Sequence, residues 1–130
     1  MSTDHPTPEK RARRLGTPSP GVGVFALVLT QAGDLVTTLV ALRSVPALEE
    51  ANVVVARAIA AFGPTVGLTV ASVVAVGSLV AATELGAAIV RDHADGSRRV
   101  VGAVRLLGYG PATALNAGVV AHNVLLLATV

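Results

Sequence analysis

Cysteine and tryptophan are absent from this chain of 130 residues, and its aromatic residues are only three: Phe25, Phe62 and Tyr109. Without cysteine, disulfides, thiolate metal sites and cysteine nucleophiles are excluded. Three aromatic side chains form at most rudimentary belts at a membrane interface, and they offer no stacking surface for nucleic-acid bases. The sequence therefore predicts no nucleic-acid partner.

Charged residues are also scarce, at 14% of the chain, whereas they make up about 25% of ordinary soluble domains. Hydrophobic residues reach 52%, and the mean hydropathy is +0.69. The net charge is only +2, and the basic residues lie at the ends of apolar segments, as topology signals do. These values predict one small all-α domain in a lipid bilayer.

The first apolar segment runs from Gly21 to Arg43 and holds one carboxylate, Asp34, near its middle. It is long enough for a membrane helix, since about 20 apolar residues cross a hydrocarbon core of about 30 Å. An ionised side chain at that depth costs roughly 2.5–3.5 kcal/mol on insertion scales. We therefore expect Asp34 to face protein or water, either uncharged or paired.

Polar residues of this segment recur at spacings of three and four, which places them on one helical stripe: Thr30, Gln31, Asp34, Thr37 and Thr38. We expect the threonine hydroxyl groups to bond to carbonyl groups of their own helix. Asp34 needs another solution, because a carboxylate has no such local partner in a helix.

A short helix is expected next, because Pro46 and two acidic residues end the first segment and Asn52 is a favourable N-cap. This helix would end near Phe62 and lie at the interface or against the bundle. Pro64 is a natural first residue for a second span over about 64–90. Small residues at every fourth position form two packing ladders in this region: Gly63, Gly67, Ala71 and Ala75, and then Ser78, Ala82 and Gly86.

Charged residues mark the cytoplasmic end of the second span. Glu84 is expected to be an interfacial acid that water or Arg91 can serve. The loop that follows contains His93 between two aspartates, which we interpret as a solvated turn instead of a metal site.

The last apolar stretch predicts a span over about 106–130, preceded by Arg105, which would reach to lipid head groups. Gly108–Pro111 reads as a helix break. Four residues then lie on one stripe at spacings of four: Gly110, Ala114, Gly118 and His122. Asn116 and Asn123 lie on another face. His122 is either a hydrogen-bonded packing residue or a proton carrier.

The basic residues predict the topology. Eight would lie on the cytoplasmic side: Lys10, Arg11, Arg13, Arg14, Arg91, Arg98, Arg99 and Arg105. Only Arg43 and Arg57 would lie outside. We thus predict a disordered basic cytoplasmic tail over 1–20, a single transmembrane domain over 21–130 and an external C-terminus, in the plasma membrane. A signal peptide is disfavoured, because the apolar region of a signal peptide spans only about 7–15 residues and the first apolar segment of this chain is longer.

Asp34 and Asn116 fall at comparable depths in their predicted spans, so they could meet. An uncharged Asp34 bonded to Asn116 or Gln31 would avoid the charge penalty, and His122 or the Glu49–Glu50 pair could connect this place to the external surface. The candidate intramembrane polar site therefore has five members: Gln31, Asp34, Thr38, Asn116 and His122.

Asp34 and Thr38, followed by Glu50 and Asn52, carry a family resemblance. The chain resembles a family of small multi-pass membrane proteins from archaea and bacteria, a domain of unknown function with an Asp-x-x-x-Thr and then a Glu-x-Asn-Pro pattern. Val53 stands here at the proline position. The resemblance covers roughly residues 30–90 and implies a shared fold but no activity. Abundant alanine and valine would also suit a high-GC bacterial or archaeal source.

The small-residue ladders and short loops favour a non-enzymatic membrane protein that packs with copies of itself or with a larger partner. The alternative is a proton- or ion-coupled transport element that uses Asp34. An intramembrane aspartyl protease needs two aspartates in its membrane spans. The predicted spans of this chain contain only one, Asp34. A metal site would need Asp34, Glu50 and His122 to converge. We expect neither enzyme activity nor a cofactor or metal.

Overall fold

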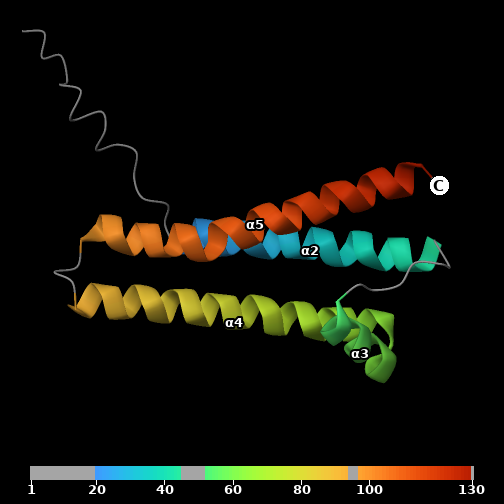
Figure 1. Ribbon diagram of the computed structural model, residues 1–130, viewed down its shortest axis with the longest axis horizontal. Coiled ribbons are helices and arrows are strands. Elements are labelled where there is room, and N and C mark those ends of the chain that lie inside the picture. The colour runs from blue at the N-terminus through green and yellow to red at the C-terminus, as the bar shows by residue number, and fades with distance from the viewer. Residues whose placement is uncertain (1–19, 45–51, 94–96, 130) are drawn as a thin grey trace, which may run out of the picture.

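The computed structural model describes residues 20–44, 52–93 and 97–129, and in this part of the chain it shows four helices and no strand (Figure 1). Their bounds are α2 (Pro20–Ser44), α3 (Val53–Phe62), α4 (Pro64–His93) and α5 (Arg98–Ala128). The all-α fold, with three long helices and a short one, is therefore confirmed. The predicted tail and the Glu49–Glu50 pair lie outside the described residues, apart from Pro20, which begins α2.

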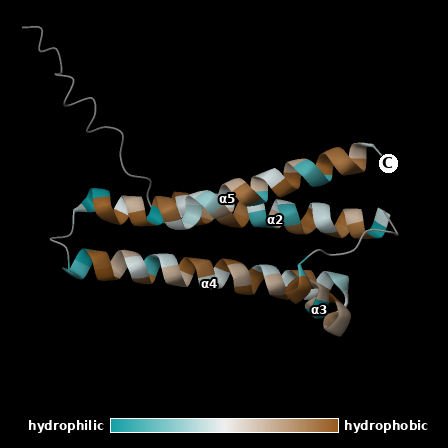
Figure 2. Cartoon of the chain, viewed as in Figure 1, coloured by the Kyte–Doolittle hydropathy of each residue, from teal (hydrophilic) through white to brown (hydrophobic). Residues whose placement is uncertain are grey.

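The three long helices lie side by side, with α2 and α5 running in one direction and α4 in the other (Figure 1). Each is long and apolar enough to cross a membrane. Apolar residues cover most of their length, and polar residues gather at helix ends and at a few interior positions (Figure 2). Each of the three long helices contacts both of the others.

Local signals set the ends of the shorter elements as the sequence predicts. Asn52 caps α3, because its side-chain oxygen accepts hydrogen bonds from the backbone N–H groups of Val54 (3.0 Å) and Val55 (3.4 Å). Gly63 ends α3 with a φ of 81°, a conformation that glycine adopts without strain, and Pro64 begins α4. Helix α3 packs against α4, and whether it lies at a membrane interface stays a prediction.

Helix α5 differs from the prediction, because it begins at Arg98 and continues through Gly108–Pro111, where we expected a break. Pro111 removes one backbone hydrogen bond, to the carbonyl group of Leu107, but neighbouring helices make this tolerable in a membrane bundle. Toward its C-terminus α5 draws away from α4 (Figure 1). Their close contacts therefore lie in the C-terminal half of α4 and the N-terminal half of α5, as at Thr83 and Gly108.

Glycines mark the closest approaches between helices. A Cβ atom on Gly23 of α2 would lie 2.7 Å from the ring of Tyr109, and one on Gly108 of α5 would lie 2.6 Å from Cγ2 of Thr83. At Gly67 it would lie 2.6 Å from the backbone of Ala58 in α3. One member of a predicted packing ladder, Gly67, therefore contacts the short helix α3, while Gly23 and Gly108 bring the long helices together.

Candidate functional site

Near the α4–α5 connection, an ion pair joins these two helices. Arg105 donates from Nε to both carboxylate oxygens of Glu84, at 3.0 and 3.2 Å, and from a terminal guanidinium nitrogen to Oε2 at 2.6 Å. The hydroxyl group of Tyr109 donates to Oε1 of the same carboxylate at 2.9 Å. We call these three residues, Glu84, Arg105 and Tyr109, the ion-pair cluster.

The ion-pair cluster corrects two predictions, because Glu84 pairs with Arg105 instead of Arg91, and Arg105 is bound to protein instead of head groups. The cause is the early start of α5. With this helix beginning at Arg98, Glu84 and Arg105 lie at nearly equal distances from the connection in two antiparallel helices. Arg91 instead forms an exposed pair with Asp92 at 3.9 Å.

Near the middle of the bundle, a chain of polar side chains crosses all three long helices. Asn116 of α5 donates to the amide oxygen of Gln31 in α2 at 2.8 Å, and Gln31 donates to the hydroxyl group of Ser72 in α4 at 3.2 Å. Interhelical hydrogen bonds of this kind typically contribute about 0.6–2 kcal/mol each in membrane bundles. Gln31 thus connects the three long helices.

Asp34 lies one helical turn beyond Gln31, and its oxygen Oδ1 accepts a hydrogen bond from the hydroxyl group of Thr38 at 3.2 Å. Asn123 of α5 donates to the hydroxyl oxygens of Thr38, at 3.1 Å, and Thr37, at 3.2 Å. Asn116 therefore bonds to Gln31, whereas the sequence predicted that Asp34 would bond to one of these two residues. Thr37 also donates to carbonyl groups of its own helix, as does Thr30.

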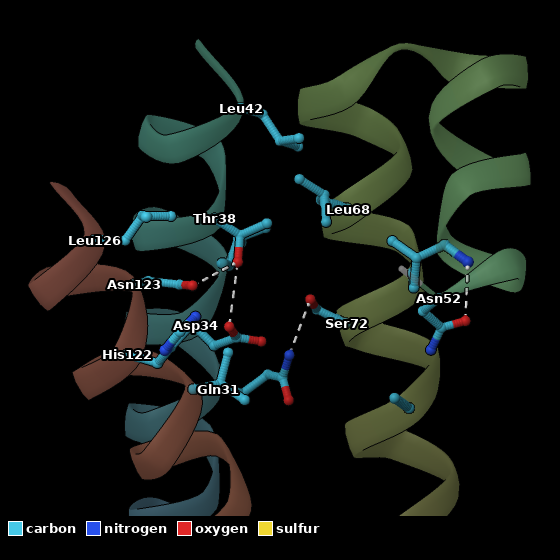
Figure 3. Close-up of a pocket in the computed structure, with 15 residues that line it drawn as sticks. Gln31, Asp34, Thr38, Leu42, Asn52, Leu68, Ser72, His122, Asn123 and Leu126 are labelled. Atoms are coloured by element: carbon cyan, nitrogen blue, oxygen red, sulfur yellow. Dashed lines mark hydrogen bonds between the residues drawn. The ribbon is translucent and has the colours of Figure 1, made fainter. Parts of the chain in front are cut away.

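These polar groups border a cavity of about 470 Å³ between α2, α4 and α5 (Figure 3). It lies at the end where α5 draws away from α4. Five polar residues, which we call the polar floor, line its inner part: Gln31, Asp34, Thr38, Ser72 and Asn123. Three leucines, the apolar rim, lie toward the helix ends: Leu42, Leu68 and Leu126. His122 and Asn52 also line the cavity, and both are exposed.

Four of the five residues predicted as a site line this one cavity: Gln31, Asp34, Thr38 and His122. The fifth, Asn116, lies outside its lining but is attached to Gln31. Three residues of the family pattern, Asp34, Thr38 and Asn52, also line it, and Glu50 lies outside the described residues.

Sequence reasoning missed two residues of the polar floor, Ser72 and Asn123. Asn123 had a signal, since it follows Asn116 by seven residues on the same helical face. Ser72 had none, because a single serine in an apolar helix usually bonds only to its own backbone.

The cavity has the chemistry of a binding site. It offers a carboxylate, amide groups and hydroxyl groups, which can hold a polar or cationic group by hydrogen bonds. In the described part of the chain, no three His, Asp or Glu side chains group closely enough to hold a metal ion. The hydroxyl group of Ser72 interacts with Gln31.

Comparison with known proteins adds one match. Residues 25–129, from within α2 to just beyond the end of α5, match the model of a protein family described as a domain of unknown function, DUF5658. Searches of curated proteins and of solved structures gave no match. The match agrees with the expectation of an uncharacterised family, while its taxonomic range and the short motif stay predictions.

Proposed function

Because the chain belongs to the DUF5658 family, whose function is unknown, we propose a role from its own side chains: a non-enzymatic integral membrane protein that packs with further helices. Three apolar helices of spanning length fit a membrane protein. The added helices come from copies of this chain or from a larger partner, and the protein acts as an accessory component of that assembly.

The observation that carries this proposal concerns two glycines within helices that have open space beside them in the described part of the chain. No atom of a neighbouring element lies within 4 Å of the place that a Cβ would take on Gly77 of α4 or Gly118 of α5. A glycine inside a helix destabilises it by about 1 kcal/mol relative to alanine. Small residues also allow another helix to approach closely in a bilayer. An intermolecular contact at these positions offsets the cost.

We also place the protein in the plasma membrane as a multi-pass protein with a cytoplasmic N-terminus. The support is the eight-to-two distribution of basic residues. In this orientation the α4–α5 connection is cytoplasmic, and the cavity opens toward the external side.

The test is native mass spectrometry of tagged protein purified from its own membranes in mild detergent. We expect either an assembly of identical chains or a stoichiometric second polypeptide. Gly77→Leu and Gly118→Leu should reduce that assembly to single chains, because leucine blocks close helix approach. A wild-type protein that is monomeric throughout would contradict the proposal.

Matched controls separate this effect from a general effect of added bulk. Ile89→Phe in α4 and Val124→Leu in α5 enlarge side chains that are each 51% exposed and lie on other faces of their helices than Gly77 and Gly118. We expect both variants to keep the wild-type assembly. Loss of assembly in the controls as well would mean that added side-chain volume anywhere on α4 or α5 disrupts the assembly.

A second candidate function is proton- or ion-coupled transport, favoured by the position of Asp34 in the floor of a cavity that His122 also borders. Three helices are few for a closed pathway, so this function also needs an assembly. It predicts a proton or cation flux in proteoliposomes that Asp34→Asn abolishes and Asp92→Asn leaves unchanged. An absence of flux from wild-type protein would remove this candidate.

A further inference from the structure

The cavity has two chemically different parts, and Figure 3 shows how they are arranged. The polar floor lies at the level of Gln31, Asp34 and Ser72, inside the bundle. Two leucines of the apolar rim, Leu42 and Leu68, lie beyond it, and the third, Leu126, lies level with Thr38 in Figure 3. Gln31 and Leu42 are eleven residues apart in one helix, so the lining extends over about 16 Å.

The volume indicates what kind of ligand fits. A water molecule occupies about 30 Å³ in the liquid, so 470 Å³ corresponds to roughly sixteen waters. That is far more than one dehydrated ion fills, and it lies within the range of about 300–1,000 Å³ that is usual for sites of small organic molecules. A ligand that uses the whole cavity therefore has an organic body.

The charged groups around the cavity indicate the polarity of the ligand. Asp34 is the one acidic residue in the described lining, which contains neither lysine nor arginine. The two described cations on the same side of the bundle have other positions: Arg43 is exposed and donates to Thr65 at 3.1 Å, and Arg57 is exposed on α3. His122 borders the cavity from α5. A positively charged head group is therefore attracted to the floor, and an anionic one is disfavoured.

We propose that this cavity is a binding site for a small amphiphilic amine. The ammonium group lies against Asp34, with the hydroxyl and amide oxygens of the polar floor as further acceptors. The hydrocarbon body lies against Leu42, Leu68 and Leu126. This arrangement follows from the order of the two parts, because an amine that enters between the leucines reaches the carboxylate with its head group first.

The described lining comes entirely from one chain, so the inference does not depend on the assembly proposed above. Binding at the cavity and association at Gly77 and Gly118 involve different surfaces. Each is measured separately, and the failure of one leaves the other intact.

The test is equilibrium dialysis of the full chain in lipid nanodiscs against three probes of similar shape: cyclohexylmethylamine, cyclohexylmethanol and cyclohexanecarboxylate. Empty nanodiscs of the same lipid measure partition into the bilayer, which is subtracted. We expect saturable binding of the amine, with affinity about tenfold or more above that of the alcohol, since hydrogen bonds to charged groups are the stronger ones. The carboxylate should not bind.

Three variants connect this binding to the cavity. Asp34→Asn retains the size of the side chain and should lower the affinity for the amine about tenfold or more, to that of the alcohol. Ala71→Leu retains the Asp34 carboxylate but fills part of the cavity, and should lower the affinity for both the amine and the alcohol. Asp92→Asn removes an exposed carboxylate at the other end of α4 and should change nothing.

Circular dichroism and size-exclusion chromatography establish that each variant is folded before its binding is compared. Equal binding of the amine by wild type and a folded Asp34→Asn variant would overturn the proposal. So would equal affinities for the three probes, or the absence of amine binding above that of empty nanodiscs.

Discussion

At the scale of single residues, the ion-pair cluster is the strongest polar contact between α4 and α5. Arg105 makes three hydrogen bonds to Glu84, and Tyr109, a residue that is only 3% exposed, donates a fourth. Tyr109 also packs on Gly23 of α2, so its side chain links all three long helices. The cluster thus stabilises the end of the bundle opposite the cavity.

Arg105→Gln should therefore lower the free energy of unfolding by about 1.5–3 kcal/mol, the usual size of hydrogen bonds to charged groups. Circular dichroism during titration with SDS measures this change in mild detergent. Arg91→Gln is the matched control, because its pair with Asp92 is long and exposed and should contribute less than about 0.5 kcal/mol. Equal effects of the two substitutions would show that the cluster is not a specific stabilising contact.

From the sequence, polar residues could be singled out where they interrupt an apolar run. Gln31, Asp34 and Thr38 stand out on a helix that is otherwise valine, leucine and alanine, and all three line the cavity. The pairing of Glu84 with Arg105 could not be predicted in the same way. It depends on the exact start of α5, and a shift of a few residues in that start moves Arg105 away from Glu84.

At the scale of elements, the contact between α3 and α4 depends on one missing side chain. Gly67 lies against the backbone of Ala58 and Ile59, and backbone cannot move aside as the end of a flexible side chain does. The short helix has no buried residue of its own. Its position therefore depends strongly on this close approach.

Gly67→Ala should displace α3 from α4, whereas Gly77→Ala in the same helix should leave it in place. Since the chain lacks cysteine, a single cysteine introduced at Ala58 reports this directly. We expect its labelling by a water-soluble maleimide to rise severalfold in Gly67→Ala and to stay at the wild-type rate in Gly77→Ala. Unchanged labelling in both variants would mean that α3 accommodates the added methyl group.

Helices α2 and α4 were predictable because length and hydropathy suffice to place a spanning helix, and Pro64 gives α4 a clear start. Helix α5 was less predictable because its break signal, Gly108–Pro111, is local, while the contacts that keep the helix continuous are tertiary. Gly108 packs on Thr83, and Tyr109 on Gly23. These contacts favour a continuous helix across Pro111, although a proline would end many isolated helices.

At the scale of the whole molecule, the proposed orientation predicts which ends are accessible from which side. Ser97 lies at the start of α5, where its side chain makes no capping hydrogen bond, and Thr129 lies just beyond the other end. Each is replaced by cysteine in a separate variant, Ser97→Cys and Thr129→Cys. In intact cells we expect a membrane-impermeant maleimide to label Thr129→Cys at least about tenfold faster, because the positive-inside rule places Ser97 in the cytoplasm. Permeabilised cells provide the control, and the opposite preference would reverse the topology.

The overall arrangement of the bundle leads to one further consequence, from the unequal reach of its helices. Tyr109 lies level with Gly23, yet α5 begins eleven residues before Tyr109 and α2 only three before Gly23. The α4–α5 hairpin thus extends about 12 Å past the start of α2 (Figure 1).

This overhang bears on bilayer thickness. The hairpin can expose or submerge part of its overhang as the hydrocarbon layer changes, at a cost of fractions of a kcal/mol per Å of mismatch. Helix α2, with 25 residues, has no extra length that could adjust in this way. The thickness of membrane that suits this protein is therefore set by its shortest span, while the two longer helices adjust to it.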